Sequence, residues 1–68
     1  MFKRGMKLEE VKAMVKENGW EILEGETYEE QGKSWTDMTV WQDDHGVDVY
    51  MNDEEGIFEI MFVPAWEL

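Results

Sequence analysis

Apolar and polar residues alternate through the second half of the chain in three segments that polar stretches separate. The segments are 34–42 (SWTDMTVWQ), 46–51 (GVDVYM) and 57–64 (IFEIMFVP), with QDDHG and NDEEG at the two junctions. Each segment is rich in Val, Ile, Thr and aromatic residues and is bounded by Asp, Asn and Gly, which is typical of strands joined by turns. The pattern predicts two hairpins that share a middle strand.

The alternation also predicts a register if each hairpin has a four-residue loop, at 43–46 and 53–56. The expected pairs are Gln42 with Val47, Val40 with Val49, Met38 with Met51, Asn52 with Ile57, Met51 with Phe58, Val49 with Ile60 and Val47 with Phe62. The predicted core face is therefore Met38, Val40, Val47, Val49, Met51, Phe58, Ile60 and Phe62. A slip of one residue would bring Asp48 and Glu59 onto that face, so the side-chain pattern specifies which face is buried.

The first third of the chain has a helical pattern. In residues 7–18, Leu8, Val11, Met14 and Val15 form one narrow apolar stripe, which predicts an amphipathic helix of about three turns. Gly19 is suited to the left-handed position that ends such a helix. A short strand, 20–24, is expected directly after it, with Trp20 and Ile22 on one face.

Residues 25–33 (GETYEEQGK) allow two interpretations. The strand can extend through Thr27 and Tyr28, with 31–33 as the turn, or the segment can be an acidic loop that is long for so small a domain. We favour the extended strand. The predicted fold class is then a single α+β domain, 1–68, with one N-terminal helix packed on a three- to four-stranded antiparallel sheet in the order α-β-β-β-β.

The join between helix and strand, VKAMVKENGWEIL at 11–23, resembles the opening of HicA-type toxin domains, which are small RNA-cleaving folds. In that family a helix ending in Asn- or His-Gly-aromatic runs into the first strand. The likeness covers about residues 7–24. The family's catalytic Gly-Ser-His element should follow, but this chain has Gly25-Glu26-Thr27 there and is acidic where the family is basic. The resemblance therefore implies a shared helix–strand architecture and not the activity.

The second face of the predicted sheet mixes aromatic and acidic residues. Its members are Trp35, Asp37, Thr39, Trp41, Asp48, Tyr50, Glu59, Met61 and Val63. One interpretation is that Phe2 or the tail, 64–68, folds back to cover part of it. The other is an interaction surface, because exposed apolar patches on small proteins tend to be interfaces and because Trp and Tyr are enriched in their hot spots.

Charge is strongly asymmetric along the chain. Seventeen acids and six bases give a net charge of −11 at pH 7. Residues 1–16 hold five bases and two acids, net +3, whereas 17–68 hold one base and fifteen acids, net −14. A domain so acidic repels nucleic acid and anionic membranes and attracts basic surfaces. The alternative is that the acids only maintain solubility.

No residue set points to catalysis, a cofactor or a metal. There is no cysteine, and the only histidine, His45, lies in a turn whose Asp43 and Asp44 are ordinary turn residues. The acidic stretch 53–56 is too short for a calcium loop, and Ser34 lacks a nucleophile motif. We expect a non-enzymatic protein. Because no apolar run approaches the ~20 residues of a membrane span and no signal peptide is evident, we expect it in the cytoplasm.

Two functional hypotheses follow. The first is an inhibitor that mimics nucleic acid and binds a basic nucleic-acid-binding protein, of the phage anti-defence or anti-CRISPR type, in the host cytoplasm. Its predicted partner-binding residues are Asp43, Asp44, Asp48, Asp53, Glu54, Glu55 and Glu59, with Trp35, Trp41 and Tyr50 as aromatic contacts. The second is a protein-interaction or homodimerisation module that uses the aromatic face, with the acids serving only solubility.

Overall fold

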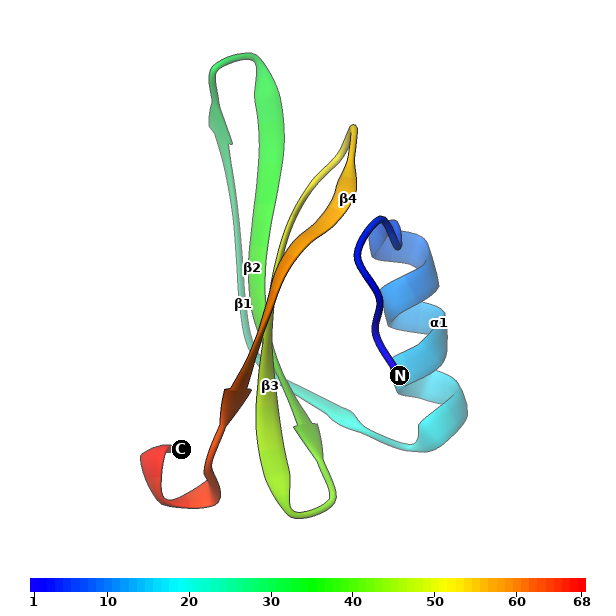
Figure 1. Cartoon of the computed structure of the whole chain (residues 1–68), viewed down its shortest axis with the longest axis vertical. Helices are drawn as coiled ribbons and strands as arrows, with labels where there is room; N and C mark the ends of the chain where they lie inside the picture. Colours follow the sequence, from blue (N-terminus) through cyan, green and yellow to red (C-terminus); the bar gives the residue numbers. More distant parts are fainter.

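A computed structural model describes all residues, 1–68, as one helix packed on one sheet (Figure 1). The elements are α1 (Leu8–Asn18), β1 (Glu21–Glu30), β2 (Lys33–Gln42), β3 (His45–Asn52), β4 (Gly56–Val63) and a short 3-10 helix, η1 (Ala65–Glu67). The sheet has four strands in the order β1-β2-β3-β4, and each neighbouring pair is antiparallel. The predicted α+β meander is confirmed, with four strands.

Helix α1 uses the predicted apolar stripe. Val11 and Val15 are buried, while Leu8 and Met14 pack at the edge of the core. Gly19 ends the helix in the left-handed conformation, with φ at 68°. Its N–H donates to Lys16 O at 3.3 Å and the next N–H donates to Val15 O at 3.0 Å, the pair of bonds that satisfies the last carbonyls of a helix. The predicted helix and the strand that directly follows it are confirmed.

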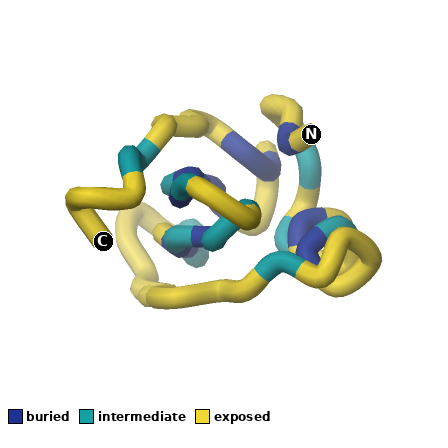
Figure 2. Tube along the Cα trace, turned by 90° about the horizontal axis from the view of Figure 1, so that it is seen from below, coloured by how far each residue is buried: buried dark blue, intermediate teal, exposed yellow.

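The core lies between α1 and the two central strands. Its buried hydrophobic residues are Phe2, Val11, Val15, Met38, Val40, Val47, Val49, Met51 and Ile57. Figure 2 shows that burial is concentrated in the central strands and the inner side of the helix, whereas both edge strands are exposed along most of their length. Phe2 packs into this core against Trp20, with ring centroids 5.7 Å apart. It does not cover the opposite face.

The first hairpin settles the conformation of residues 25–33. Strand β1 runs through Thr27 and Tyr28 to Glu30, as the extended-strand interpretation predicted. Gln31 and Gly32 both have positive φ, at 53° and 75°, which is the backbone of a tight two-residue hairpin turn. Glu30 pairs with Lys33 next to this turn.

The predicted register of the β2–β3 hairpin is wrong by two residues. The observed pairs are Gln42 with His45, Val40 with Val47 and Met38 with Val49. The loop is two residues instead of four because Asp43 takes a positive φ of 62°, a conformation that Asp tolerates better than most residues. A shift of two residues keeps every side chain on its predicted face, so the buried set on β2 and β3 is correct.

The β3–β4 hairpin differs through a β-bulge. Asn52 pairs with Gly56 and Met51 with Ile57, so the predicted partners of Asn52 and Met51 are wrong. The register then shifts, which leaves Phe58 as the extra residue and restores the predicted pairs of Val49 with Ile60 and Val47 with Phe62. The buried Asn52 accounts for the shorter turn, because its Oδ1 accepts bonds from two turn N–H groups, those of Glu54 and Glu55. Ile57 is buried in place of Phe58. The predicted core residues Ile60 and Phe62 keep their predicted pairs but are exposed, because β4 is an edge strand.

The segment before α1 pairs with the start of β4. The N–H of Gly5 donates to Ile57 O at 2.9 Å, and the N–H of Ile57 donates to Met6 O at 2.8 Å. Gly56 makes this approach possible, because a Cβ there would lie closer than 3.0 Å to the backbone of Gly5 and Met6. The chain before the helix is thus tied to the sheet.

Candidate functional site

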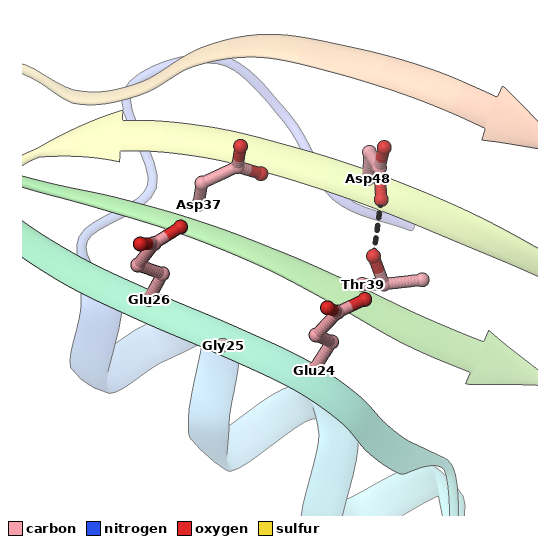
Figure 3. Close-up of a pocket in the computed structure, with 6 residues that line it drawn as sticks. All are labelled: Glu24, Gly25, Glu26, Asp37, Thr39 and Asp48. Atoms are coloured by element: carbon pink, nitrogen blue, oxygen red, sulfur yellow. Dashed lines mark hydrogen bonds between the residues drawn. The ribbon is translucent and has the colours of Figure 1, made fainter.

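The face of the sheet opposite α1 has carboxylates from all four strands at its centre. The ladder aligns them in two rows across the sheet: Glu24, Thr39, Asp48 and Met61 in one, Glu26, Asp37, Tyr50 and Glu59 in the next. Figure 3 shows the carboxylates of Glu24, Glu26, Asp37 and Asp48 projecting away from the helix that lies below the sheet. We call Glu24, Glu26, Asp37, Asp48 and Glu59 the acidic strip.

Two adjoining hollows follow the acidic strip. The larger, about 470 Å³, is lined by Glu24, Gly25, Glu26, Asp37, Thr39 and Asp48 and has no hydrophobic side chain (Figure 3). The smaller hollow, about 200 Å³, shares Asp37 and Asp48 and adds Tyr50, Glu59 and Met61. The strip is therefore recessed enough to receive side chains of a partner.

Like charges crowd within the strip. Partial burial, and then the negative charges of Asp48, Glu26 and Glu24, raise the pKa of Asp37. The Thr39 hydroxyl donates a hydrogen bond to Asp48. No basic side chain neutralises the strip, since the two ion pairs of the chain are Lys33 with Glu54, at 4.0 Å, and His45 with Asp44. The strip acids therefore face solvent without an ion-pair partner.

An aromatic cluster adjoins the strip at one end. It consists of Tyr28, Trp35, Tyr50 and Phe58. Trp35 stacks on Tyr50 with centroids 5.1 Å apart, and Phe58 meets both rings edge-on at 6.2 and 6.4 Å. The Tyr28 and Tyr50 hydroxyls are 3.1 Å apart. That hydrogen bond is the main reason that the pKa of Tyr28 rises to about 12.

The other end of the face is partly covered by the tail. Strand β4 ends at Val63, directly before Pro64. The chain then turns through η1, and Leu68 comes to lie against Gly46, whose strand partner on β4 is Val63. Gly46 pairs with Trp41, which is half-buried. The tail, and not Phe2, therefore shields one end of this face and leaves the acidic strip open.

The predicted acidic residues do not form one group. Asp43 and Asp44 lie in the β2–β3 turn at one end of the sheet, and Asp53, Glu54 and Glu55 lie in the β3–β4 turn at the other (Figure 1). Only Asp48 and Glu59 belong to the strip. Trp35 and Tyr50 are in the aromatic cluster, while Trp41 lies at the end that the tail shields.

Several turn acids have local structural roles. Asp53 Oδ1 accepts a bond from the Ser34 N–H at 3.2 Å, and Glu55 accepts one from Asn52 Nδ2 at 3.1 Å. Asp44 Oδ1 lies 2.7 Å from His45 Nδ1, and this hydrogen bond lowers the pKa of Asp44. These turn acids are engaged in local hydrogen bonds, so the acidic strip is the better candidate for binding a partner.

Sequence reasoning missed Glu24 and Glu26, and placed Asp37 on this face without including it among the partner-binding residues. The signal was present: Glu24, Glu26 and Tyr28 alternate at every second position. With a two-residue turn at 31–32 they fall opposite Thr39, Asp37 and Trp35. Because 25–33 had two open interpretations, no register was predicted there.

The chain contains no group of three or more His, Asp or Glu side chains arranged to hold a metal ion. None of its helices is both long and apolar enough to cross a membrane. A scan against protein-family models found no match, and searches of curated proteins and of solved structures found no similar protein. The functional argument therefore depends on the geometry of the site.

Proposed function

We propose that this is a non-enzymatic binding protein whose acidic strip docks on the nucleic-acid-binding surface of a basic partner and blocks it. The main support is that the five carboxylates of the acidic strip come from four strands, lie on one open face and have no ion-pair partner. Competition for a nucleic-acid-binding surface is the behaviour of phage antagonists of host defence, including anti-CRISPR proteins.

The clustering is hard to explain by solubility. Glu26 and Asp37 are directly opposite in the β1–β2 ladder, and like charges in that position destabilise a sheet, by up to about 1 kcal/mol for a pair. Acids scattered over the surface would keep the chain soluble without that cost. A binding surface, in contrast, needs its charges together.

The charge density of the strip fits nucleic acid. Neighbouring strands lie about 4.8 Å apart, so the carboxylates of the four strands follow one another across about 14 Å, with a second β1 carboxylate beside the first. One strand of a DNA duplex carries one charge per about 3.4 Å of helix axis. Arg and Lys side chains that bind successive phosphates would therefore meet carboxylates at a similar density.

The aromatic cluster supplies an apolar contact beside the charges. Phe58 is more than half exposed, while Trp35 and Tyr50 are held in place by stacking on each other. Arg guanidinium groups stack on aromatic faces as well as pairing with carboxylates. An Arg-rich partner would thus find both kinds of contact on one face.

A second candidate function is a protein-interaction module in which the apolar groups of this face carry the affinity. Phe58 and Met61 are both more than half exposed beside the strip. Salt separates the two candidates, because screening weakens a charge-driven complex and leaves an apolar one nearly unchanged.

The test is capture of partners from a host lysate by the immobilised protein at about 50 mM salt, followed by elution at about 500 mM. The proposal predicts that basic nucleic-acid-binding proteins are retained, are released by salt and are displaced by duplex DNA or RNA. Retention that persists at high salt and ignores nucleic acid would favour the apolar module.

A further inference from the structure

The two edges of the sheet differ sharply in charge. Strand β1 exposes five acids: Glu21, Glu24, Glu26, Glu29 and Glu30. Strand β4 carries one acid, Glu59, and four exposed apolar residues: Phe58 (52%), Ile60 (39%), Met61 (54%) and Phe62 (64%). Charged residues on an edge strand prevent pairing with another chain. Edge β1 has this protection and β4 does not.

The backbone of β4 is also open. Gly5 and Met6 pair with Ile57, at the start of the strand, and no backbone group of another element pairs with the outer edge from Phe58 to Val63. On the helix side, Ile60 and Phe62 line an apolar hollow of about 270 Å³ together with Phe2 and Val47. An uncovered edge with exposed apolar groups on both faces is a site for strand addition.

We infer that β4 pairs antiparallel with β4 of a second copy of this chain, about a two-fold axis at Met61. In that register Ile60 lies opposite Phe62 of the second copy, and Glu59 lies opposite Val63. Opposed residues keep the same face in both copies because their numbers differ by an even step. The apolar side chains therefore meet each other, and the two Glu59 carboxylates stay apart.

The pattern of β4 is self-complementary, which favours a second copy as the occupant: about the axis at Met61, Ile60 meets Phe62, Met61 meets Met61, and no acid meets an acid. A chain of net charge −11 repels itself along every acidic edge, and β4 is the edge where that repulsion is smallest. A cationic strand would instead be drawn to β1. The two-fold contact closes on itself, so pairing ends at a dimer, while the acids of β1 oppose any further extension of the sheet.

The dimer would change the site as well as the edge. Because the axis is perpendicular to the sheet, both acidic strips lie on the same side of one eight-stranded sheet. On the helix side, the apolar hollow beside each β4 would adjoin its counterpart. The dimer does not depend on the proposed function, but it would double the length of acidic surface offered to a partner.

The test compares Ile60→Lys with Ile22→Lys by sedimentation equilibrium at protein concentrations up to about 1 mM, since interfaces this small bind weakly. Ile22 is a matched control: it lies on the other edge strand and is 40% exposed, against 39% for Ile60. We expect the wild type and Ile22→Lys to dimerise and Ile60→Lys to associate roughly tenfold or more weakly, because each dimer loses two cross-strand apolar pairs. Circular dichroism checks that both variants are folded.

The register has its own test. Phe62→Glu alone should also weaken the dimer, but a mixture of Phe62→Glu with Ile60→Lys should form heterodimers, because one Lys–Glu pair and one Ile–Phe pair then lie opposite each other. Rising salt should hold or strengthen the dimer, in contrast to the salt-weakened binding proposed for the acidic strip. A monomeric wild type, or equal effects of Ile60→Lys and Ile22→Lys, would overturn the inference and leave the proposed function untouched.

Discussion

Glu26 and Asp37 lie directly opposite each other on the open face of the β1–β2 hairpin. Asp48 and Glu24 add their charges from the neighbouring row, and no lysine or arginine lines the hollow between them. A sheet gains nothing from this arrangement in the free protein. The like charges that form the proposed binding surface therefore lower the stability of the fold.

Replacing Asp37 should have opposite effects on the stability of the fold and on binding to basic partners. We expect Asp37→Asn to raise the free energy of unfolding at pH 7 by up to about 1 kcal/mol, because it removes a like charge facing Glu26, and to weaken capture of basic partners. Urea unfolding measures the first effect. Glu29→Gln is the matched control, since Glu29 pairs with the neutral Ser34 on the same strand pair. An equal gain in the control would show that only net charge matters.

The repulsion at Asp37 should also make the free energy of unfolding depend on pH. The pKa of Asp37 is raised in the folded state above its ordinary value of 3.8, so the folded protein binds the proton more tightly than the unfolded chain does. Stability from this group therefore increases as pH falls through the raised pKa toward 3.8. The stability difference between Asp37→Asn and wild type should shrink over that window. A difference that is constant with pH would contradict the cause given for the shift.

Tyr28 offers a spectroscopic test of the aromatic cluster. Its pKa is raised from 10.0 to about 12, chiefly by the hydrogen bond with Tyr50. Absorbance titration of the two tyrosines should show one phenol ionising near that value. In Tyr50→Phe the remaining phenol should titrate back toward 10.0, because its partner is gone. An unchanged titration of Tyr28 in that variant would mean that the hydrogen bond is not the cause.

The attachment of the N-terminal segment can be tested at Gly56. This residue has φ at 79°, and an added Cβ would meet the backbone of Gly5 and Met6. Gly32 has a similar φ of 75° with nothing within 4 Å of the added Cβ. Gly32→Ala should cost about 1–2 kcal/mol for the left-handed backbone alone. Gly56→Ala should lose clearly more stability than Gly32→Ala, because the added Cβ also meets the backbone of Gly5 and Met6. Thermal unfolding measures both losses, and equal losses would rule out the close approach.

The sequence predicted the fold well because the buried positions obey simple periods. The stripe of Val11 and Val15 and the alternation of Met38, Val40, Val47 and Val49 identify the helix, the central strands and their inner faces. The register of the β2–β3 hairpin was predicted wrongly by two residues, but the assignment of side chains to faces was still correct because side chains alternate with a period of two.

Phe58 was misplaced because a β-bulge has no signature in an alternation of apolar residues. Ile57 and Phe58 are both large and apolar, so the pattern could not say which of them is buried. The choice is made by Asn52, which closes the turn early, and by Gly5 and Met6, which pair with Ile57. These are long-range or side-chain contacts that the local pattern does not contain.

The sequence predicted an acidic and aromatic face but not which acids form the acidic strip. The acids in turns were prominent in the sequence because they are adjacent, yet Asp53 and Glu55 are engaged in holding the β3–β4 turn. Glu24 and Glu26 are brought beside Asp37 and Asp48 only by the β1–β2 pairing. Which acids come together depends on the β1–β2 register, and no register was predicted there because residues 25–33 allowed either a strand or a loop.

The most direct test of the central claim compares two charge-matched triple variants in the lysate capture. One neutralises the strip with Glu26→Gln, Asp37→Asn and Asp48→Asn; the other removes the same charge elsewhere with Glu9→Gln, Glu17→Gln and Glu67→Gln. The account predicts that the strip variant loses the salt-released basic partners at low salt while the other variant keeps them. Equal retention, or equal loss, in the two variants would contradict it.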